Sequence, residues 1–251
     1  MKDRYWAKNK YSKLNPADYE LQRFTGSAGK LIDEAEKRAV LDLFLSSGID
    51  CRKELKILDV ATGPGRLAFY LEEHLRKTEI TGVDINENML KRARKITEDN
   101  KSKIHFMKGD VYNLPFQDSR FDAVVGLRFS MHLPDFPKVL SELSRVLKPG
   151  GVLVFDFFNL QSLLFLKTIN HTGGKVGYFT VGKMKEIASR HGLLFKSSKG
   201  ILLLGETLMR KLPRFFYYFK KIIAKLPIFT EPFSTKIIIA FKKVQNDQRN
   251  V

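Results

Sequence analysis

Two aspartates that flank a glycine turn are the residues of this sequence best placed to do chemistry. Asp59 lies near the end of the apolar run Leu55–Val60, the turn Ala61–Gly65 follows, and Asp84 ends a second apolar run. The two glycines of the turn allow backbone conformations and a close ligand approach that a Cβ would prevent. In sheets built from such units, ligands bind at the carboxyl ends of the strands. The pattern therefore predicts a nucleotide-like ligand on this turn.

The spacing of the turn fits two classes of ligand. Gly63-x-Gly65-x-x-Ala68, followed by Asp84, satisfies the dinucleotide fingerprint, in which the acidic residue about 20 residues on binds ribose hydroxyls. Asp59 favours a different ligand, because its carboxylate would repel a pyrophosphate and attract the cationic group of an amino acid. As a single residue, Asp59 is better explained as a cap of the turn, and only its place in the series of motifs below reverses this preference.

Three later segments favour a ligand that contains adenosine and a free amino acid. Asp110 follows Gly109 after the next predicted strand, where its carboxylate suits an adenine amino group. Phe121–Gly126 is a further apolar strand, and Leu147–Gly151 is a Lys-Pro-Gly-Gly turn before the strand that follows. Four motifs in a fixed order are far more specific than one glycine turn.

With these motifs the chain resembles class I S-adenosylmethionine-dependent methyltransferases, particularly the branch of quinone-biosynthesis and other small-molecule methyltransferases. The matching motifs cover roughly residues 55 to 158: Ile57–Gly65, Gly82–Met89, Gly109–Phe116 with Phe121 and Asp122, and Leu147–Gly151. One departure is Ala61, where the family often has glycine. Alanine is a variant in the quinone-related branch, so we expect the pocket to persist.

The resemblance implies a role for each matching residue in an S-adenosyl-L-methionine site. Asp84 would bind both ribose hydroxyls. The other implied positions are Asp59, Ala61, Thr62, Gly63 and Gly65 against the methionine portion, Ile85 and Met89 beside adenine, Asp110 and Val111 at the adenine amino group, and Leu127 and Arg128 near the sulfonium. In the N-terminal arm, Arg23 is a further candidate, because a guanidinium suits the cofactor carboxylate. Tyr19, in the same arm, is a weaker candidate for cofactor binding. A solvated surface arginine is an equal alternative for Arg23.

His132 is the candidate catalytic residue. It follows the predicted strand Phe121–Gly126, next to the expected methyl-transfer zone, and a neutral imidazole there could take a proton from a hydroxyl or enol. The favoured alternative is a histidine that packs the loop. Methyl transfer can be accelerated largely by orientation, so a dedicated base is not obligatory.

A basic aromatic segment precedes the last predicted strand. In Arg214–Leu226, three phenylalanines, two isoleucines and a leucine share one helical face, with arginine and lysines on the other, as in helices that lie in a membrane interface. A lid helix packed on its own domain is the commoner alternative. The chain carries 44 Lys and Arg against 27 Asp and Glu, net +17, which attracts phosphates of lipid or nucleic acid. Nucleic acid ranks lower, because the aromatics bunch on one apolar face instead of forming spaced stacking platforms.

Short apolar strands alternate with amphipathic helices along most of the chain. Strands are predicted at residues 55–60, 79–84, 104–107, 121–126, 151–157, 194–204 and 236–244, with helices at 30–47, after Gly65, around 89–96, within 136–147 and at 181–191. This alternation predicts an α/β, Rossmann-like, doubly wound fold: a mostly parallel seven-stranded sheet with an antiparallel last strand. We expect residues 1–50 to form an arm with lid helices, 51–160 the S-adenosylmethionine-binding core, and 161–251 the second half, with an acceptor-site insertion near 205–233.

Composition excludes several classes of protein. Hydrophobic residues make up 43% and charged residues 28% of 251, which excludes collagen-like, low-complexity and wholly disordered chains. The single cysteine, Cys51, and five histidines favour a reducing, cytoplasmic location without a metal site. No apolar run approaches a spanning length, so export and anchoring are not expected. The predicted function is a methyltransferase acting on a small, lipophilic or quinone-like acceptor. RNA methylation, an NAD(P)-dependent oxidoreductase and a non-catalytic cofactor sensor remain alternatives.

Overall fold

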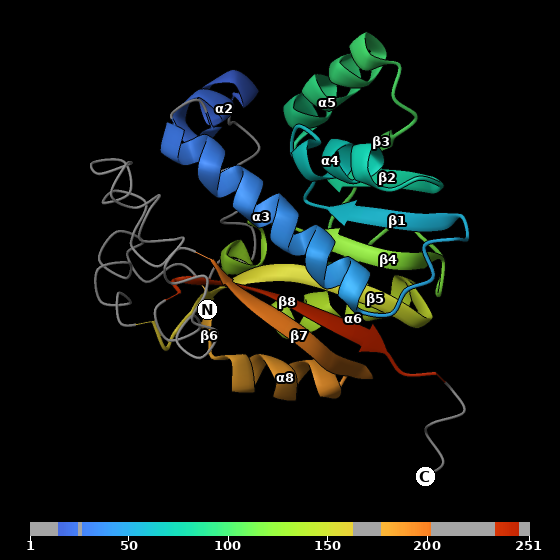
Figure 1. Cartoon of the computed structure of the whole chain (residues 1–251), viewed down its shortest axis with the longest axis vertical. Helices are drawn as coiled ribbons and strands as arrows, with labels where there is room; N and C mark the ends of the chain where they lie inside the picture. Colours follow the sequence, from blue (N-terminus) through green and yellow to red (C-terminus); the bar gives the residue numbers. More distant parts are fainter. Residues whose placement is uncertain (1–14, 25–26, 163–176, 202–233, 246–251) are drawn as a thin grey trace.

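The computed structural model describes residues 15–24, 27–162, 177–201 and 234–245 (Figure 1). Its centre is one sheet with the strand order β3-β2-β1-β4-β5-β8-β7, and β6 pairs with β5 off this path. The strands are β1 Leu55–Val60, β2 Thr78–Asp84, β3 His105–Lys108, β4 Phe121–Gly126, β5 Leu147–Asn159, β6 Tyr178–Phe179, β7 Leu193–Ile201 and β8 Lys236–Lys243. β8 runs antiparallel to both β5 and β7, and the other described pairs are parallel.

Helices cover both faces of the sheet, because neighbouring residues on each strand point to opposite sides. On β1, Ile57 belongs to a core cluster with residues of α3 (Ser27–Ser46), α4 (Arg66–His74) and α5 (Glu87–Asn100), whereas Leu58 belongs to a cluster with residues of α6 (Phe136–Val146) and α8 (Val181–Ser189). Figure 1 shows α3 crossing the first face and α8 beside β7. The helices are α2 Pro16–Phe24, α3 Ser27–Ser46, α4 Arg66–His74, α5 Glu87–Asn100, α6 Phe136–Val146 and α8 Val181–Ser189, with a 3-10 turn at Ser130–His132.

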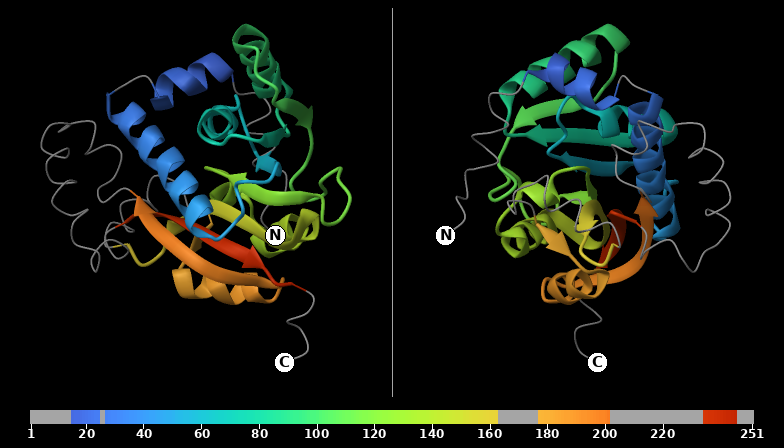
Figure 2. Two further views of the ribbon diagram at one scale, coloured as in Figure 1. Left: turned by 45° about the vertical axis from the view of Figure 1, so that its right-hand side comes forward. Right: turned by 90° about the vertical axis from the view of Figure 1, so that its left-hand side faces the viewer.

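Side chains at the helix starts explain where the helices begin. Asn86 accepts hydrogen bonds from the amides of Asn88 and Met89 at the start of α5, Asp135 caps α6, and Thr180 caps α8. Each satisfies amides that have no partner within the helix. α2 contacts both α3 and α5 (Figure 2). Among the described residues, no helix is long and apolar enough to cross a membrane.

The predicted fold class is confirmed, with two corrections. The sheet has an eighth strand, β6, whose two residues are too few to show a strand pattern in the sequence. Leu147 belongs to β5 and not to the preceding helix, because it is extended with ψ 135°, and Pro149 disfavours helical backbone just before it. The division into three parts stays a prediction. The segments 1–14 and 202–233, with the predicted insertion and the basic aromatic helix, lie outside the described residues.

Candidate functional site

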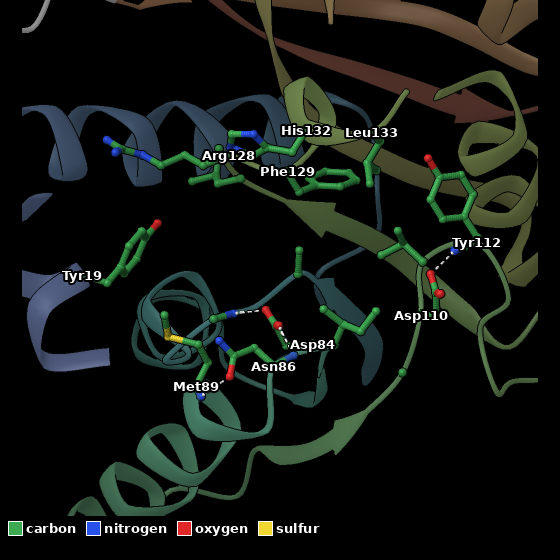
Figure 3. A pocket seen from close by; sticks show the side chains of 16 residues that line it. Tyr19, Asp84, Asn86, Met89, Asp110, Tyr112, Arg128, Phe129, His132 and Leu133 are labelled. Carbon is green, nitrogen blue, oxygen red and sulfur yellow. Dashed lines mark hydrogen bonds between the residues drawn. The ribbon is translucent and has the colours of Figure 1, made fainter. Parts of the chain in front are cut away.

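A cavity lies at the carboxyl ends of β1 to β4, beside the point where the strand order reverses between β1 and β4. Such switch points are where open α/β sheets bind ligands. The cavity encloses about 980 Å³ of free space, including its open mouth. Figure 3 shows side chains facing each other across it. We define the β2 wall as Asp84, Ile85, Asn86 and Met89, and the β4 wall as Leu127, Arg128, Phe129, His132 and Leu133.

The glycine turn joins the end of β1 to the β2 wall. The amide of Gly63 donates to Asp84 Oδ2 over 2.8 Å, and the amide of Thr62 donates to the carbonyl of Val83 over 3.0 Å. Gly65 has φ +83°, and a Cβ there would lie 2.7 Å from the Phe106 ring. Gly65 therefore permits the turn and its packing but lines neither described cavity. Ala61 also adopts a left-handed backbone, with φ +51°.

Asp59 lies in a smaller side cavity beneath this turn. Its side chain is buried, and its Oδ2 accepts a 2.6 Å hydrogen bond from Thr62 Oγ1. Burial, assisted by the charge of Asp84, raises the pKa of Asp59 to about 7 although the Thr62 bond opposes this rise. Arg66 lines the same side cavity. Its guanidinium pairs with Asp33 and lies 3.5 Å from the centroid of the Phe24 ring. The side cavity thus holds one acidic and one basic group.

The β2 wall presents carboxylate oxygens held by backbone amides. Asp84 accepts from Gly63 and, through Oδ1, from the amide of Asn86 over 2.8 Å. Burial raises the pKa of Asp84 above its ordinary value, and these amide bonds limit the rise. At the end of the cavity, Asp110 accepts a 3.0 Å bond from the amide of Tyr112. Asp84 and Asp110 can both accept further hydrogen bonds from a ligand, because an ionised carboxylate has about four acceptor sites.

The β4 wall is held by groups from distant strands and helices. Arg128 Nε lies 2.7 Å from Glu36 Oε2 on α3, and the Arg128 amide donates to Asp156 Oδ1 on β5 over 2.6 Å. His132 closes the 3-10 turn, its amide donating to the carbonyl of Phe129 over 3.0 Å. Tyr19 of α2 lines the cavity beside Arg128 (Figure 3). The wall is otherwise apolar.

The structure brings nearly all the predicted site residues together. The main cavity or its side cavity is lined by Tyr19, Asp59, Ala61, Thr62, Gly63, Asp84, Ile85, Met89, Asp110, Val111, Leu127, Arg128 and His132. Gly65 lies in the turn without lining either cavity, and the side chain of Arg23 lies outside the described residues. Ligand contacts of the lining residues stay predictions.

Eight further lining residues were not predicted as site residues: Pro64, Arg66, Leu67, Asn86, Gly109, Tyr112, Phe129 and Leu133. Arg66 directly follows the glycine turn and Asn86 follows Asp84 by two residues, so position next to a motif was an available signal. Phe129 and Leu133 look like ordinary loop apolar residues in the sequence. Within the described residues, no group of three or more His, Cys, Asp or Glu is arranged to hold a metal ion.

Residues 57–151 match a family model described as a methyltransferase domain. The chain is 39% identical over 118 residues to a demethylmenaquinone methyltransferase of Thermus thermophilus, an alignment that covers 47% of this chain and 51% of that protein. It is 38% identical over 100 residues to a phthiotriol/phenolphthiotriol dimycocerosates methyltransferase of Mycobacterium leprae, covering 40% of this chain and 36% of that one. The chain thus spans about half or less of these relatives' lengths.

A solved structure of an S-adenosylmethionine-dependent methyltransferase from Thermotoga maritima has the same fold. The TM-score is 0.65 at 19% identity, and the match covers 95% of this chain and 99% of the other. At this identity the likeness establishes the fold alone. The match of residues 57–151 to a methyltransferase domain agrees with the resemblance seen in the motifs, and the solved structure shares the fold.

Proposed function

Because residues 57–151 match a methyltransferase domain and the fold is that of a solved S-adenosylmethionine-dependent methyltransferase, we propose that this chain transfers a methyl group from S-adenosyl-L-methionine to a small lipophilic acceptor. The cofactor would lie along the β2 wall with its amino-acid end in the side cavity. When bound, it supplies an electrophilic methyl group on a sulfonium.

The observation that carries this proposal is the charge pattern of two connected cavities. The side cavity is lined by both Asp59 and Arg66, an acidic and a basic group that match the ammonium and carboxylate of a free amino acid. The main cavity offers Asp84 and Asp110, which match ribose hydroxyls and an adenine amino group. Tyr19, Ala61, Gly63 and Leu127 line both cavities, so one ligand could reach both. A pyrophosphate on the turn would instead meet the carboxyl of Asp59.

The β4 wall supports an apolar acceptor with an ionisable hydroxyl. Phe129 and Leu133 give it an apolar surface, and the imidazole of His132 stands beside them (Figure 3). We propose that His132 takes the proton that the acceptor loses on methylation. The Thermus relative is named for a quinone and the Mycobacterium relative for a lipid, which supports a lipophilic acceptor here. Replacing His132 with Gln, which keeps a polar side chain, should lower kcat without weakening cofactor binding.

We also propose a cytoplasmic location with contact to anionic membranes through residues 214–226. A basic aromatic sequence there would bind the membrane surface in which a lipophilic substrate is dissolved. Co-sedimentation with vesicles containing anionic lipid, compared with neutral vesicles, tests this contact. Equal sedimentation with both kinds of vesicle would contradict an electrostatic contribution.

Calorimetric titration with S-adenosylmethionine, S-adenosylhomocysteine and NAD tests the cofactor. We expect binding of the first two and none of NAD. Transfer of a labelled methyl group to a reduced 2-prenyl-1,4-naphthoquinone tests the acceptor class. Binding of NAD alone would contradict the whole proposal, whereas cofactor binding without transfer to this probe would contradict the quinol acceptor.

A further inference from the structure

Four charged side chains are buried together behind the β4 wall. Glu36 comes from α3, Arg128 from the loop after β4, Asp156 from β5 and Lys236 from the start of β8. Glu36 and Asp156 are 0% exposed and Lys236 is 4% exposed. Two carboxylates and two cations make the group neutral in total. We call these four residues the charge quartet.

Lys236 is the member that touches both carboxylates through its side chain. Its Nζ lies 2.6 Å from Glu36 Oε1 and 3.2 Å from Asp156 Oδ2. Glu36 uses its other oxygen for Arg128 Nε, and Asp156 uses its other oxygen for the Arg128 amide. Both carboxylates are thus shared between Lys236 and Arg128.

Asp156 fixes the backbone from which the β4 wall is built. Besides accepting from the Arg128 amide, its carbonyl accepts from the hydroxyl of Ser130. Arg128 has φ +62°, a left-handed conformation that an arginine adopts only when its surroundings hold it there. The segment from Arg128 to His132 therefore depends on β5, and through the carboxylate of Asp156 on Lys236.

The charge balance of the quartet decides whether its carboxylates stay ionised. Burial alone raises the pKa of Glu36, but Lys236 and Arg128 outweigh it and hold this pKa below the ordinary value. Burial raises the pKa of Asp156 despite the attraction of Lys236. Among the described residues, Tyr19 of α2 is a further titratable group near Arg128. Without Lys236, Arg128 would be left to neutralise two buried carboxylates, which burial would drive to take up a proton.

We propose that Lys236 is a positioning residue for the reaction: its ion pairs with Glu36 and Asp156 fix both carboxylates, and these in turn hold the Arg128–His132 segment against the acceptor. This inference rests on the proposed methyltransferase function. Lys236 itself does not line the described cavities, so its effect must pass through Arg128 and Asp156.

The test compares Lys236→Met with two other variants. The double variant Glu36→Gln with Lys236→Met removes one charge of each sign, so that the remaining Arg128 and Asp156 are again neutral together. Lys199→Met is the matched control, because Lys199 on β7 also pairs with an acid of α3, Asp42, but both side chains are more than 40% exposed. S-adenosylhomocysteine affinity is measured by calorimetry, and turnover with the naphthoquinol probe as a function of pH.

For Lys236→Met we expect a loss of about tenfold or more in kcat, with S-adenosylhomocysteine affinity within about threefold of the wild type. The kcat of Lys236→Met should rise with pH through the neutral range, because a quartet carboxylate that has lost its lysine partner gives up a proton. This rising part of the pH profile should be absent from the wild type. The double variant should lack this rise of kcat with pH and should recover much of the wild-type kcat. Lys199→Met should match the wild type. If Lys236→Met does not fold, Asp156→Asn, which keeps the side-chain size, must show the same selective loss of kcat.

Two results would overturn the inference while leaving the methyltransferase function intact. One is that the Lys236→Met variant, or the Asp156→Asn variant used in its place, keeps the wild-type kcat and pH profile. The other is a double variant that regains thermal stability without regaining kcat, which would make the quartet a purely structural element. A wild-type protein that neither binds S-adenosylhomocysteine nor methylates the probe would instead refute the proposed function, and the positioning role with it.

Discussion

The two walls of the cavity are held in place by different kinds of contact. On the β2 wall, Asp84 binds the amide of Asn86, two residues away, and that of Gly63, 21 residues away. On the β4 wall, Arg128 binds Glu36, 92 residues away, and Glu36 binds Lys236, 200 residues away. The first wall is made by one β-turn-α unit and its neighbour. The second wall exists only once α3, β5 and β8 have assembled around it.

This difference assigns distinct roles to the two walls. Local hydrogen bonds make the β2 wall a stable cradle for a ligand portion that does not change, which suits a cofactor. The β4 wall is tuned from several distant segments, so substitutions far from the cavity can alter it. We therefore expect cofactor binding to be insensitive to changes at Glu36, Asp156 and Lys236, which do not line the cavities, and acceptor turnover to be sensitive to them.

The largest expected effect on stability comes from Lys236. Lys236→Met leaves two buried carboxylates with one cation, and removing one partner of a buried ion pair typically costs about 3–5 kcal/mol. Urea unfolding followed by circular dichroism measures this loss. Lys199→Met, which breaks the exposed pair with Asp42, should cost about 1 kcal/mol or less. Equal losses in the two variants would show that burial of the quartet is unimportant.

The next effect concerns the β2 wall. Asp84→Ala should weaken S-adenosylhomocysteine binding about 100-fold or more, because it removes charge-assisted hydrogen bonds worth about 1.5–3 kcal/mol each. Calorimetry measures the loss, with thermal melting to check the fold, since Asp84 also holds the Gly63 amide. Asp99→Ala, an exposed acid on α5, is the control and should bind normally. Retained affinity in Asp84→Ala would remove the ribose role from this residue.

A smaller effect should appear in the pH dependence of stability, to which the carboxyl group of Asp59 contributes. In the folded chain its pKa is about 7, whereas an unfolded aspartate titrates near about 4. Between these values the folded state holds more protons, so this group makes stability fall as pH rises from about 4 to 7. The Asp59→Asn variant should lack that slope in melting temperature.

Ligand binding should show the opposite trend at the same residue. A bound ammonium favours ionised Asp59, so S-adenosylhomocysteine affinity in the wild type should rise with pH up to about 7. Asp59→Asn should bind more weakly and with a flatter pH profile. Parallel profiles in the two proteins would mean that Asp59 does not face the amino-acid end of the ligand.

The smallest effect is expected at the turn. Ala61 has φ +51°, a region that costs an L-residue about 1–2 kcal/mol, while glycine loses more backbone entropy on folding, about 0.5–1 kcal/mol. Ala61→Gly should therefore raise the free energy of unfolding by about 1 kcal/mol or less. A lower free energy of unfolding for Ala61→Gly, measured by urea unfolding, would show that the methyl group of Ala61 packs favourably enough to outweigh the strain.

Sequence patterns predicted three of the four residues of the β2 wall and three of the five residues of the β4 wall. Asp59, Asp84 and Asp110 each lie near the end of a predicted strand and within four residues of a glycine, and that short-range pattern is visible without any knowledge of the tertiary fold. Asn86, also close to this pattern, caps α5, but its place in the cavity wall was not predicted.

The charge quartet left weaker traces in the sequence. Asp156 interrupts the apolar run Val152–Phe158, Lys236 directly precedes Ile237, and Glu36 lies on the apolar side of α3 next to Ile32 and Val40. A charge in an apolar run predicts a buried group that needs a partner. Which charges pair depends on β8 lying between β5 and β7, and no local pattern carries that information. β6 was missed for a different reason, because its two residues are too few to show a strand pattern.

The late position of β8 in the chain has a consequence for synthesis on the ribosome. β1, β2 and β3 with their helices are complete before β5 is made, so the cradle for the cofactor can form on a nascent chain. The edge of β5 stays open until β8 emerges, and until then Asp156 has neither its neighbouring strand nor its lysine. A stalled or shortened product lacking β8 would therefore present an unpaired strand edge to other chains.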